Sequence, residues 1–360
     1  MNPRFSVSAL AALAIAAVAA QGCSKGSSTP TPVPSATISG SPAPDTLYVQ
    51  DATSRSVRGY RNASGINGAA NPFETLPTND TTNPDVVYSP VFDTLWYPVA
   101  YAPPTFTGNQ STPINVWFAA SAKNVKNPDA VVPFTNSAGA AAYDATHDFL
   151  YVAQVNSATV QIFASAHTLG MAGNTAPAGG ITLGITDTGS GTGQPPRAQE
   201  MLYDAASDRL FVSDQGTVVA VFDAFGATAA AAAASHATVP LSASREISGL
   251  YQPDGLAYNA SADTLFVAEL VRKQITIIKG ASVANGPAGH STTITGFNSP
   301  GGLAYDSVRD ILFVYDPIDI DVLPNATAAA GALTAVPNRR VIFDSTIALS
   351  GFGIAVDTTH

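Results

Sequence analysis

The chain has 360 residues and a formal net charge of −10, and 46% of its residues are hydrophobic whereas only 12% are charged. The negative charge and the lack of a basic run exclude sequence-independent nucleic-acid binding, which needs clustered Lys and Arg to displace counterions from phosphates. Gly and Pro number 29 and 26, which is typical of many short strands joined by tight turns rather than of long helices.

The N-terminal segment is typical of an export signal. Arg4 precedes an apolar stretch from about Val7 to Ala20, which is too short to span a membrane as a helix and has the length of a signal-peptide core. The segment ends at Gly22-Cys23, and Cys23 is the only cysteine of the chain. We therefore expect residues 1–22 to be a signal peptide.

This segment resembles the lipobox of bacterial lipoproteins, in which the cysteine is acylated and becomes the mature N-terminus. Gly22 fits that pattern, whereas Ala20-Gln21 departs from it. The resemblance implies that Cys23 is lipidated; the alternative is cleavage after Ala17-Val18-Ala19, which would leave a free thiol. In bacteria with two membranes, the same resemblance implies, through Ser24, sorting to the outer membrane, so the protein would lie at the cell envelope and face the periplasm or the cell surface.

Residues 23–44 are predicted to be a tether between the lipid and the folded body. They consist almost wholly of Ser, Thr, Pro, Gly and Ala after the cysteine and Lys25, a composition that favours an extended, solvated linker. The lipid anchor would be the only contact with the membrane. The remainder, residues 45–360, is expected to be a single domain.

A short phrase recurs along this domain. Each copy has an apolar stretch ending in Tyr, then Asp, Asn or Ser, three variable residues, Asp, any residue, and further apolar residues. The marker tyrosines, which lie 47 to 60 residues apart, are Tyr88, Tyr143, Tyr203, Tyr258 and Tyr305. A sixth copy is divided, with its first half at Ile354 to Asp357 and its second at Asp45 to Val49. These spacings predict a ring of six units.

Each unit is predicted to contain four strands. The two acidic or amide residues that follow the Tyr bracket a tight turn, where their side chains can accept hydrogen bonds from local amides. The second strand is continuously apolar, as in Leu265-Phe266-Val267, and is expected to be covered on both faces. The third alternates, as in Ile320-Asp321-Val322-Leu323, and its polar positions are expected to be exposed. A variable loop and a fourth strand, such as Arg340-Val341-Ile342-Phe343, follow.

Four antiparallel strands per unit, repeated around a ring, define a β-propeller. The chain resembles the six-bladed propellers of the NHL and YVTN type, which share the Pro-x-Gly-Leu-Ala-x-Asp opening seen best at Pro253 to Asn259 and Pro300 to Asp306. The resemblance implies an all-β, six-bladed propeller of four-stranded blades, closed by the C-terminal strand joining the N-terminal blade. It implies little about activity, because the same fold serves enzymes and binding modules.

The loops before the inner strands contain the candidate site. Hydrolytic propellers that resemble gluconolactonases hold a divalent metal in the central channel with Glu, Asn and Asp side chains. The corresponding loops here contain Asp85, Glu200 and Asp254, whose oxygens could bind calcium. The three acids do not share one offset from their marker residues, however. The alternative is that Asp254 caps a turn and that the other two are solvated.

No catalytic residue is predicted elsewhere. No histidine lies at a spacing from a carboxylate that signals catalysis. Asp316, Asp319 and Asp321 resemble the start of a calcium loop but lack its Gly and closing Glu, and two of them are expected on the polar face of a strand. The alanine-rich run Ala227 to Ala234 is compatible with a short helical turn or a flexible loop.

The sequence favours a binding module without a cofactor. It would be an exported, lipid-anchored monomer that presents loops and an apolar-edged channel mouth to a protein, peptide or glycan partner at the bacterial cell envelope. The alternative is a metal-dependent, lactonase-like hydrolase with calcium in the channel, bound by Asp85, Glu200 and Asp254. A structural envelope protein without a discrete ligand is a third hypothesis.

Overall fold

The computed structural model describes residues 44–359, apart from positions 52, 79–84, 100–111, 123–126, 136, 156, 187–197, 215, 290, 318 and 345–352. The expected signal peptide, Cys23 and nearly all of the tether lie outside the described residues. Within the described part, no helix has the length and apolar character needed to cross a membrane.

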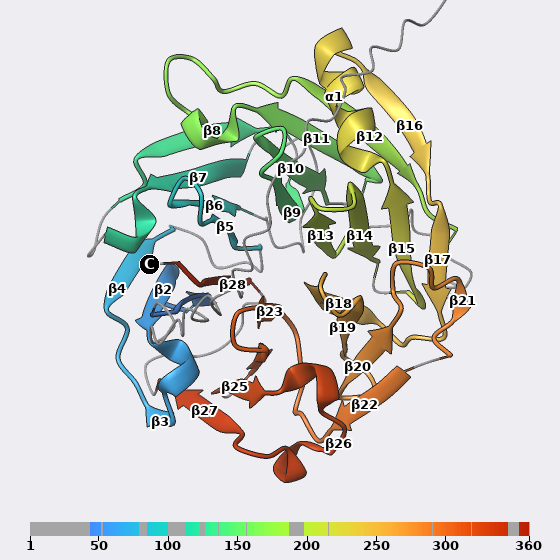
Figure 1. Cartoon of the computed structure of the whole chain (residues 1–360). Coiled ribbons are helices and arrows are strands. Elements are labelled where there is room, and N and C mark those ends of the chain that lie inside the picture. The colour runs from blue at the N-terminus through green and yellow to red at the C-terminus, as the bar shows by residue number, and fades with distance from the viewer. Residues whose placement is uncertain are drawn as a thin grey trace, which may run out of the picture. The chain divides into compact units, whose positions relative to one another are not determined.

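The described residues form a six-bladed β-propeller, with six small sheets arranged around one axis (Figure 1). Blade 1 contains β28 (Ile354–Asp357), β1 (Thr46–Asp51), β2 (Ser56–Arg61) and β4 (Glu74–Pro77), and blade 2 contains β5 (Val87–Ser89), β6 (Thr94–Pro98), β7 (Thr112–Phe118) and β8 (Ala130–Phe134). Blade 3 contains β9 (Ala138–Asp144), β10 (Phe149–Gln154), β11 (Thr159–Ala164) and β12 (Gly179–Gly184).

Blade 4 contains β13 (Glu200–Asp204), β14 (Arg209–Ser213), β15 (Val218–Asp223) and β17 (Arg245–Ser248). Blade 5 contains β18 (Pro253–Asn259), β19 (Thr264–Glu269), β20 (Gln274–Lys279) and β22 (Ser291–Thr295), and blade 6 contains β23 (Leu303–Asp306), β24 (Ile311–Asp316), β25 (Asp319–Pro324) and β27 (Arg340–Phe343). In every blade these four strands are antiparallel, and the first lies innermost. The predicted fold is confirmed.

Strand β28 closes the ring as the sequence predicted. It pairs antiparallel with β1, with Ile354 opposite Val49 and Asp357 opposite Thr46. Side chains add a second link between blades 6 and 1, because Asp344 accepts hydrogen bonds from Arg58 at 2.8 Å and from Tyr60 at 2.9 Å. The first and last blades are therefore joined both by backbone and by a buried polar contact.

Four blades have a fifth strand, which the sequence did not predict. Each fifth strand comes from the connection between strands three and four of the next blade and pairs parallel with the outer strand of the preceding one. They are β16 (Thr238–Ser242) on β12, β21 (Gly286–Pro287) on β17, β26 (Gly331–Ala332) on β22, and β3 (Gly68–Ala69) on β27. Since β3 belongs to the N-terminal part of the chain, it forms a further connection between blades 1 and 6.

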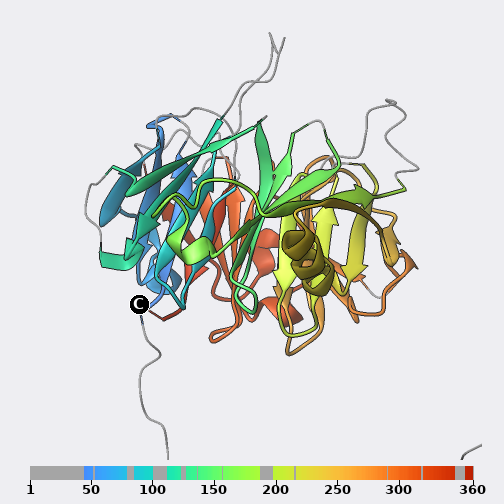
Figure 2. The same ribbon diagram turned by 90° about the horizontal axis from the view of Figure 1, so that it is seen from above.

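The alanine-rich run forms a helix at the rim of the ring. Helix α1 (Phe225–Ser235) lies beside β12 and β16 (Figures 1 and 2). Its side chains Phe225, Ala229 and Ala232 are buried in the apolar cluster between blades 3 and 4. Packing of small alanine side chains against the neighbouring blade thus selects the helical alternative over a flexible loop.

The hydrophobic core consists of six clusters, one between each pair of neighbouring blades in the described part of the chain. The cluster that joins blades 6 and 1, for example, combines Leu47 of blade 1 with Phe313 and Tyr315 of blade 6. The prediction of exposed polar positions on the third strands was wrong for Thr276 and Asp321, which are 3% and 0% exposed, because adjoining strands and blades cover them.

The recurring Asp residues form a clamp within each blade, and in five blades the marker Tyr takes part in it. Asp144, directly after Tyr143, accepts hydrogen bonds from the amides of Thr146 and His147, as predicted for a tight turn. The second Asp has a longer reach: Asp263 accepts from the hydroxyl of Tyr258 at 2.8 Å and from the amide and hydroxyl of Ser282 at 2.8 and 2.7 Å. It therefore fixes the turn after the third strand.

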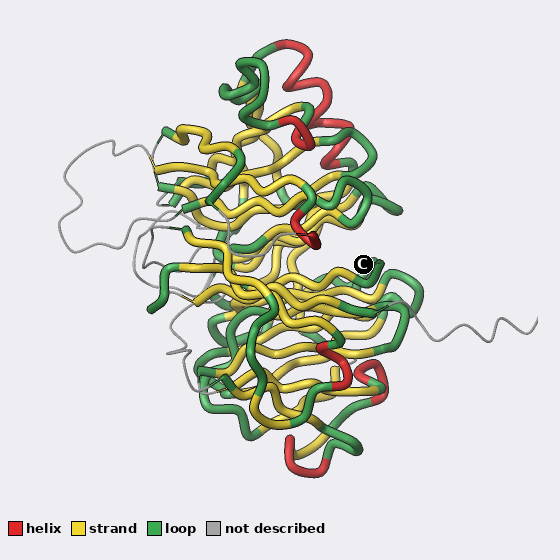
Figure 3. Tube along the Cα trace, turned by 90° about the vertical axis from the view of Figure 1, so that its left-hand side faces the viewer, coloured by secondary structure: helices red, strands yellow, loops and turns green. Residues whose placement is uncertain are grey.

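The same clamp recurs around the ring. The corresponding contacts join Asp45 with Ser64, Asp93 with Tyr88 and Ser121, Asp148 with Tyr143 and His167, Asp208 with Tyr203 and Gly226, and Asp310 with Tyr305 and Thr327. Four of these turns contain short 3-10 helices, at η1 (Ala63–Gly65), η2 (Ala120–Ala122), η3 (Ala166–Thr168) and η4 (Ala326–Ala328), and a fifth such helix, η5 (Leu333–Ala335), lies in a later connection. The helical turns gather on one side of the ring (Figure 3).

The repeated Pro-x-Gly opening permits close approach of neighbouring blades. A Cβ atom at Gly255 would lie 2.2 Å from the carbonyl oxygen of Gly301 and 2.9 Å from the Cα of Gly302. Because those are backbone atoms, a side chain could be accommodated only if blade 5 moved relative to blade 6.

Deletion of residues 350–360 is expected to abolish soluble folded protein. The deletion removes β28, exposing the edge of β1 and the apolar surface that β28 covers. The measurement is thermal unfolding followed by circular dichroism, and deletion of residues 358–360, which leaves β28 intact, is the control. A cooperative transition retained by the larger deletion would contradict this role of β28.

The substitution Asp263→Ala is expected to lower the free energy of unfolding by roughly 2–4 kcal/mol, because it removes three hydrogen bonds and places Ala at a positive φ. Asp263→Asn should cost less, since Asn tolerates this conformation and retains one acceptor oxygen. Urea denaturation measures both. A change under about 0.5 kcal/mol for Asp263→Ala would show that the clamp is dispensable.

Candidate functional site

The inner strands of all six blades line a central cavity of about 370 Å³. Most of its described lining is small or apolar, including Ala141, Leu256 and Ala304. The charged residues in this lining are Asp85 and Glu200, and it contains no Lys, Arg or His. The cavity wall thus combines apolar side chains and tyrosines with two acids, and its described part contains no basic counterion.

The marker tyrosines also line the cavity, but their hydroxyl groups are occupied. Tyr258 and Tyr305 donate to Asp263 and Asp310 of their own blades. Asn259 of blade 5 in turn donates to the hydroxyl of Tyr305 in blade 6 at 2.6 Å. Burial, followed by the interaction with its carboxylate partner, raises the pKa of Tyr258. These phenols therefore act as structural links between strands and blades and not as bases.

The structure brings together the acids that the sequence singled out. Asp85 precedes β5, Glu200 begins β13, and Asp254 lies in β18, where it is 2% exposed. Glu200 and Asp85 influence each other's ionisation, and the charge of Asp254 also acts on Glu200. The alternative of a solvated acid was wrong for Asp85, which is only 8% exposed, whereas Glu200 is half-buried.

Burial dominates the ionisation of this pair. It raises the pKa of Asp85 to about 7, although the amides of Ala141 and Val86 partly oppose the shift by donating to its carboxylate. Burial, and then the charges of Asp85 and Asp254, raise the pKa of Glu200 well above its usual range. The charged form of Glu200 is therefore disfavoured, and Asp85 changes charge near neutral pH.

The arrangement of the channel acids differs from that of a compact metal site. One oxygen of Asp85 accepts the amide of Val86 at 2.8 Å and the other that of Ala141 at 3.1 Å. Asp85, Glu200 and Asp254 do not bring three ligand atoms within 4.8 Å of one another, whereas Asp316, Asp319 and Asp321 in blade 6 do. The channel acids are therefore neighbours without the close spacing of the aspartates in blade 6.

Two histidines have carboxylate partners that the sequence did not reveal. His147 lies 2.7 Å from Asp144, and His167 contacts Asp148. Both carboxylates also accept backbone amides of the same turns. The histidine contacts therefore extend the structural clamp of blade 3. The contact between His147 and Asp144 could have been predicted from the sequence, because His147 follows Asp144 by three residues within the recurrent turn.

Comparison with known proteins supports the fold. A chain from the crystal structure of a nidogen/laminin complex is similar over 88% of this chain and 99% of its own length, with a TM-score of 0.50 and 10% sequence identity. At that identity the similarity shows the six-bladed propeller alone. No family model matches the sequence. No curated protein matches it either.

Replacement of Glu200 by Gln is expected to stabilise the protein at alkaline pH. An acid whose pKa is raised in the folded state binds more protons there than in the unfolded chain. Stability therefore falls as the pH rises above the pKa that the group has in the unfolded chain. Glu200→Gln removes this loss, because Gln has nearly the same shape and carries no charge. We expect an increase in Tm of roughly 2–6 °C at pH 8 and almost none at pH 5.

Thermal unfolding from pH 5 to pH 9 measures this effect. Glu246→Gln, on the outer strand β17, is the matched control. An equal change in Tm at both ends of the pH range, or a decrease at pH 8, would show that burial of Glu200 does not disfavour its charged form.

Proposed function

We propose that the protein is an exported, lipid-anchored propeller that binds a protein or peptide partner at the bacterial cell envelope. The apolar N-terminal stretch and Cys23 support export and lipidation. The similar propeller chain comes from a nidogen/laminin complex, and the present chain would likewise use its ring for protein binding. Loops at the mouth of a rigid ring are suited to recognition.

The observation that carries this proposal is the acidic, otherwise apolar cavity. Its volume of about 370 Å³ is near the lower end of the range for small-molecule sites, so it suits one side chain of a partner better than a large ligand. Asp85 and Glu200 have no basic residue beside them in the described lining. We infer that a Lys or Arg of the partner enters the cavity and pairs with Asp85.

Affinity for such a partner should rise with pH. The pKa of Asp85 is about 7, so its ionised fraction rises from about one tenth at pH 6 to about nine tenths at pH 8. Selection from a random peptide library should therefore enrich Lys or Arg, and binding of the selected peptides, measured by fluorescence anisotropy, should be several-fold tighter at pH 8.

Two channel variants make this experiment specific. Asp85→Asn removes the group that becomes charged and should weaken binding at least tenfold, whereas Glu200→Gln retains Asp85 and should bind within about threefold of wild type. Thermal unfolding establishes that both variants are folded. Enrichment without basic residues, or equal affinity of Asp85→Asn and wild type, would contradict the proposal.

The alternative remains a metal-dependent, lactonase-like hydrolase. The proximity of Asp85, Glu200 and Asp254 favours it, whereas the spacing of the three acids, which brings no three ligand atoms within 4.8 Å of one another, favours the binding module. Turnover of lactones that requires calcium and is lost in both Asp254→Ala and Glu200→Gln would select the hydrolase.

A further inference from the structure

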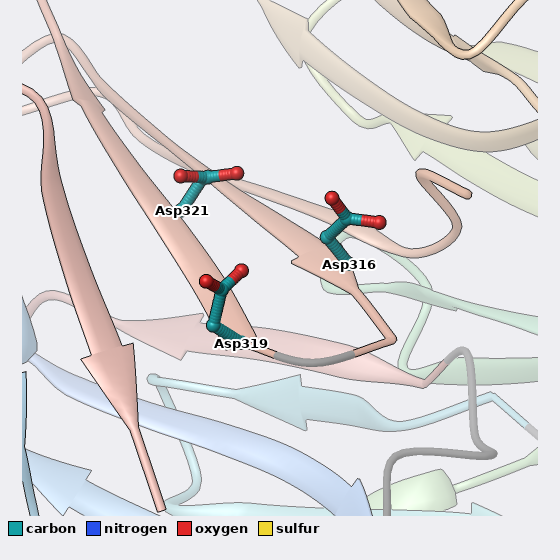
Figure 4. A group of neighbouring side chains, drawn as sticks. All are labelled: Asp316, Asp319 and Asp321. Carbon is teal, nitrogen blue, oxygen red and sulfur yellow. The ribbon is translucent and has the colours of Figure 1, made fainter. Parts of the chain in front are cut away.

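Three aspartates converge at the hairpin between the second and third strands of blade 6. Asp316 ends β24 and lies opposite Asp319, which begins β25, and Asp321 follows on the same face. One oxygen of each carboxylate lies within 4.8 Å of the others. Figure 4 shows the three side chains extending from the two strands into the same region. Proximity of acids alone does not define a site, but two further features do.

The first feature is a buried oxygen without a hydrogen-bond donor. Asp321 is 0% exposed, and its Oδ1 accepts hydrogen bonds from Arg339, with the Nε 2.6 Å away. Its Oδ2 is also buried, yet no described residue donates to it. An orphaned carboxylate oxygen in the interior is costly unless a proton or a cation satisfies it.

The second feature is a comparison among the blades. In blade 5, Glu269 ends the second strand. Gln274 lies opposite it on the third strand, and Thr276 follows two residues later; both donate hydrogen bonds to the carboxylate of Glu269. In blade 1, Asp51 has the same place, and Arg58, which corresponds to Thr276, pairs with it at 2.6 Å. In both blades, hydrogen-bond donors on the third strand therefore contact the acid that ends the second strand.

At the corresponding positions of its third strand, blade 6 has acids in place of the hydrogen-bond donors of blades 1 and 5. Asp319 corresponds by register to Gln274, and Asp321 corresponds to Thr276 and Arg58. If all three carboxylates are ionised, they carry three negative charges, and Arg339 offsets one. A divalent cation would neutralise the other two negative charges and take the place of the hydrogen-bond donors found in blades 1 and 5.

We propose that Asp316, Asp319 and Asp321 bind one divalent cation, and that calcium is preferred. Calcium takes oxygen ligands at about 2.3–2.6 Å, so two ligands of one ion lie up to about 5 Å apart, as the spacing of these carboxylates allows. Asp316 also accepts the amides of Asn298 and Ser299. The ion would thus connect the hairpin with the loop that leads into blade 6.

Calorimetric titration of the full-length chain, after chelator treatment and dialysis, tests the site with calcium chloride and magnesium chloride separately. We expect one calcium ion per chain, weaker magnesium binding, and an increase in Tm with calcium concentration. The partly exposed Asp319 is the residue to change: Asp319→Asn should weaken calcium binding at least tenfold. Its Tm without calcium should equal or exceed that of wild type, because the substitution removes repulsion.

Asp85→Asn is the matched control, since it changes a buried aspartate in the channel and should leave the calcium response intact. Loss of calcium binding in Asp85→Asn but not in Asp319→Asn would place the ion in the channel and overturn this inference. No heat and no shift in Tm up to 10 mM calcium or magnesium would also overturn it. Asp321→Asn provides a second test, because retention of wild-type affinity in that variant would be incompatible with its role as a ligand.

Discussion

Among the described residues, no blade has a hydrophobic core of its own, and the rest of the structure depends on this constraint. Apolar side chains are buried between neighbouring blades, in six clusters around the described ring. Each blade is therefore covered only when both neighbours are present, and the first and last blades must meet. Strand pairing by β28 and β3 and the contacts of Asp344 with Arg58 and Tyr60 all serve that junction.

The same constraint explains why the recurring polar residues are structural. The acid five residues after each marker Tyr connects the turn between strands one and two with the turn after strand three. This contact therefore holds the first three strands of a blade together at one end. The repetition of Tyr and Asp along the sequence thus reflects repetition of one geometric requirement.

The sequence predicted the fold because its repeat is regular. The Tyr and Asp spacing identified the inner strands, and the divided copy at residues 354–357 and 45–49 identified the closing blade. The fifth strands could not be predicted in this way: Gly68–Ala69 and Gly286–Pro287 are two-residue segments without a periodic pattern, and their pairing depends on the position of the adjacent blade. Burial of Asp321 was missed for the same reason, since its cover comes from outside its own strand.

The sequence predicted which residues form the candidate site but not how their carboxyl groups ionise. Position before an inner strand was sufficient to select Asp85, Glu200 and Asp254. The raised pKa of Asp85 depends on its burial, opposed by its backbone contacts, and no sequence pattern encodes these. The most direct test of the account is ¹³C NMR of aspartate carboxyl groups across a pH titration, with Asp85→Asn used to assign the resonance. A midpoint near 7 for Asp85 is predicted, whereas a midpoint at or below its ordinary value of about 4 would contradict the account of the channel.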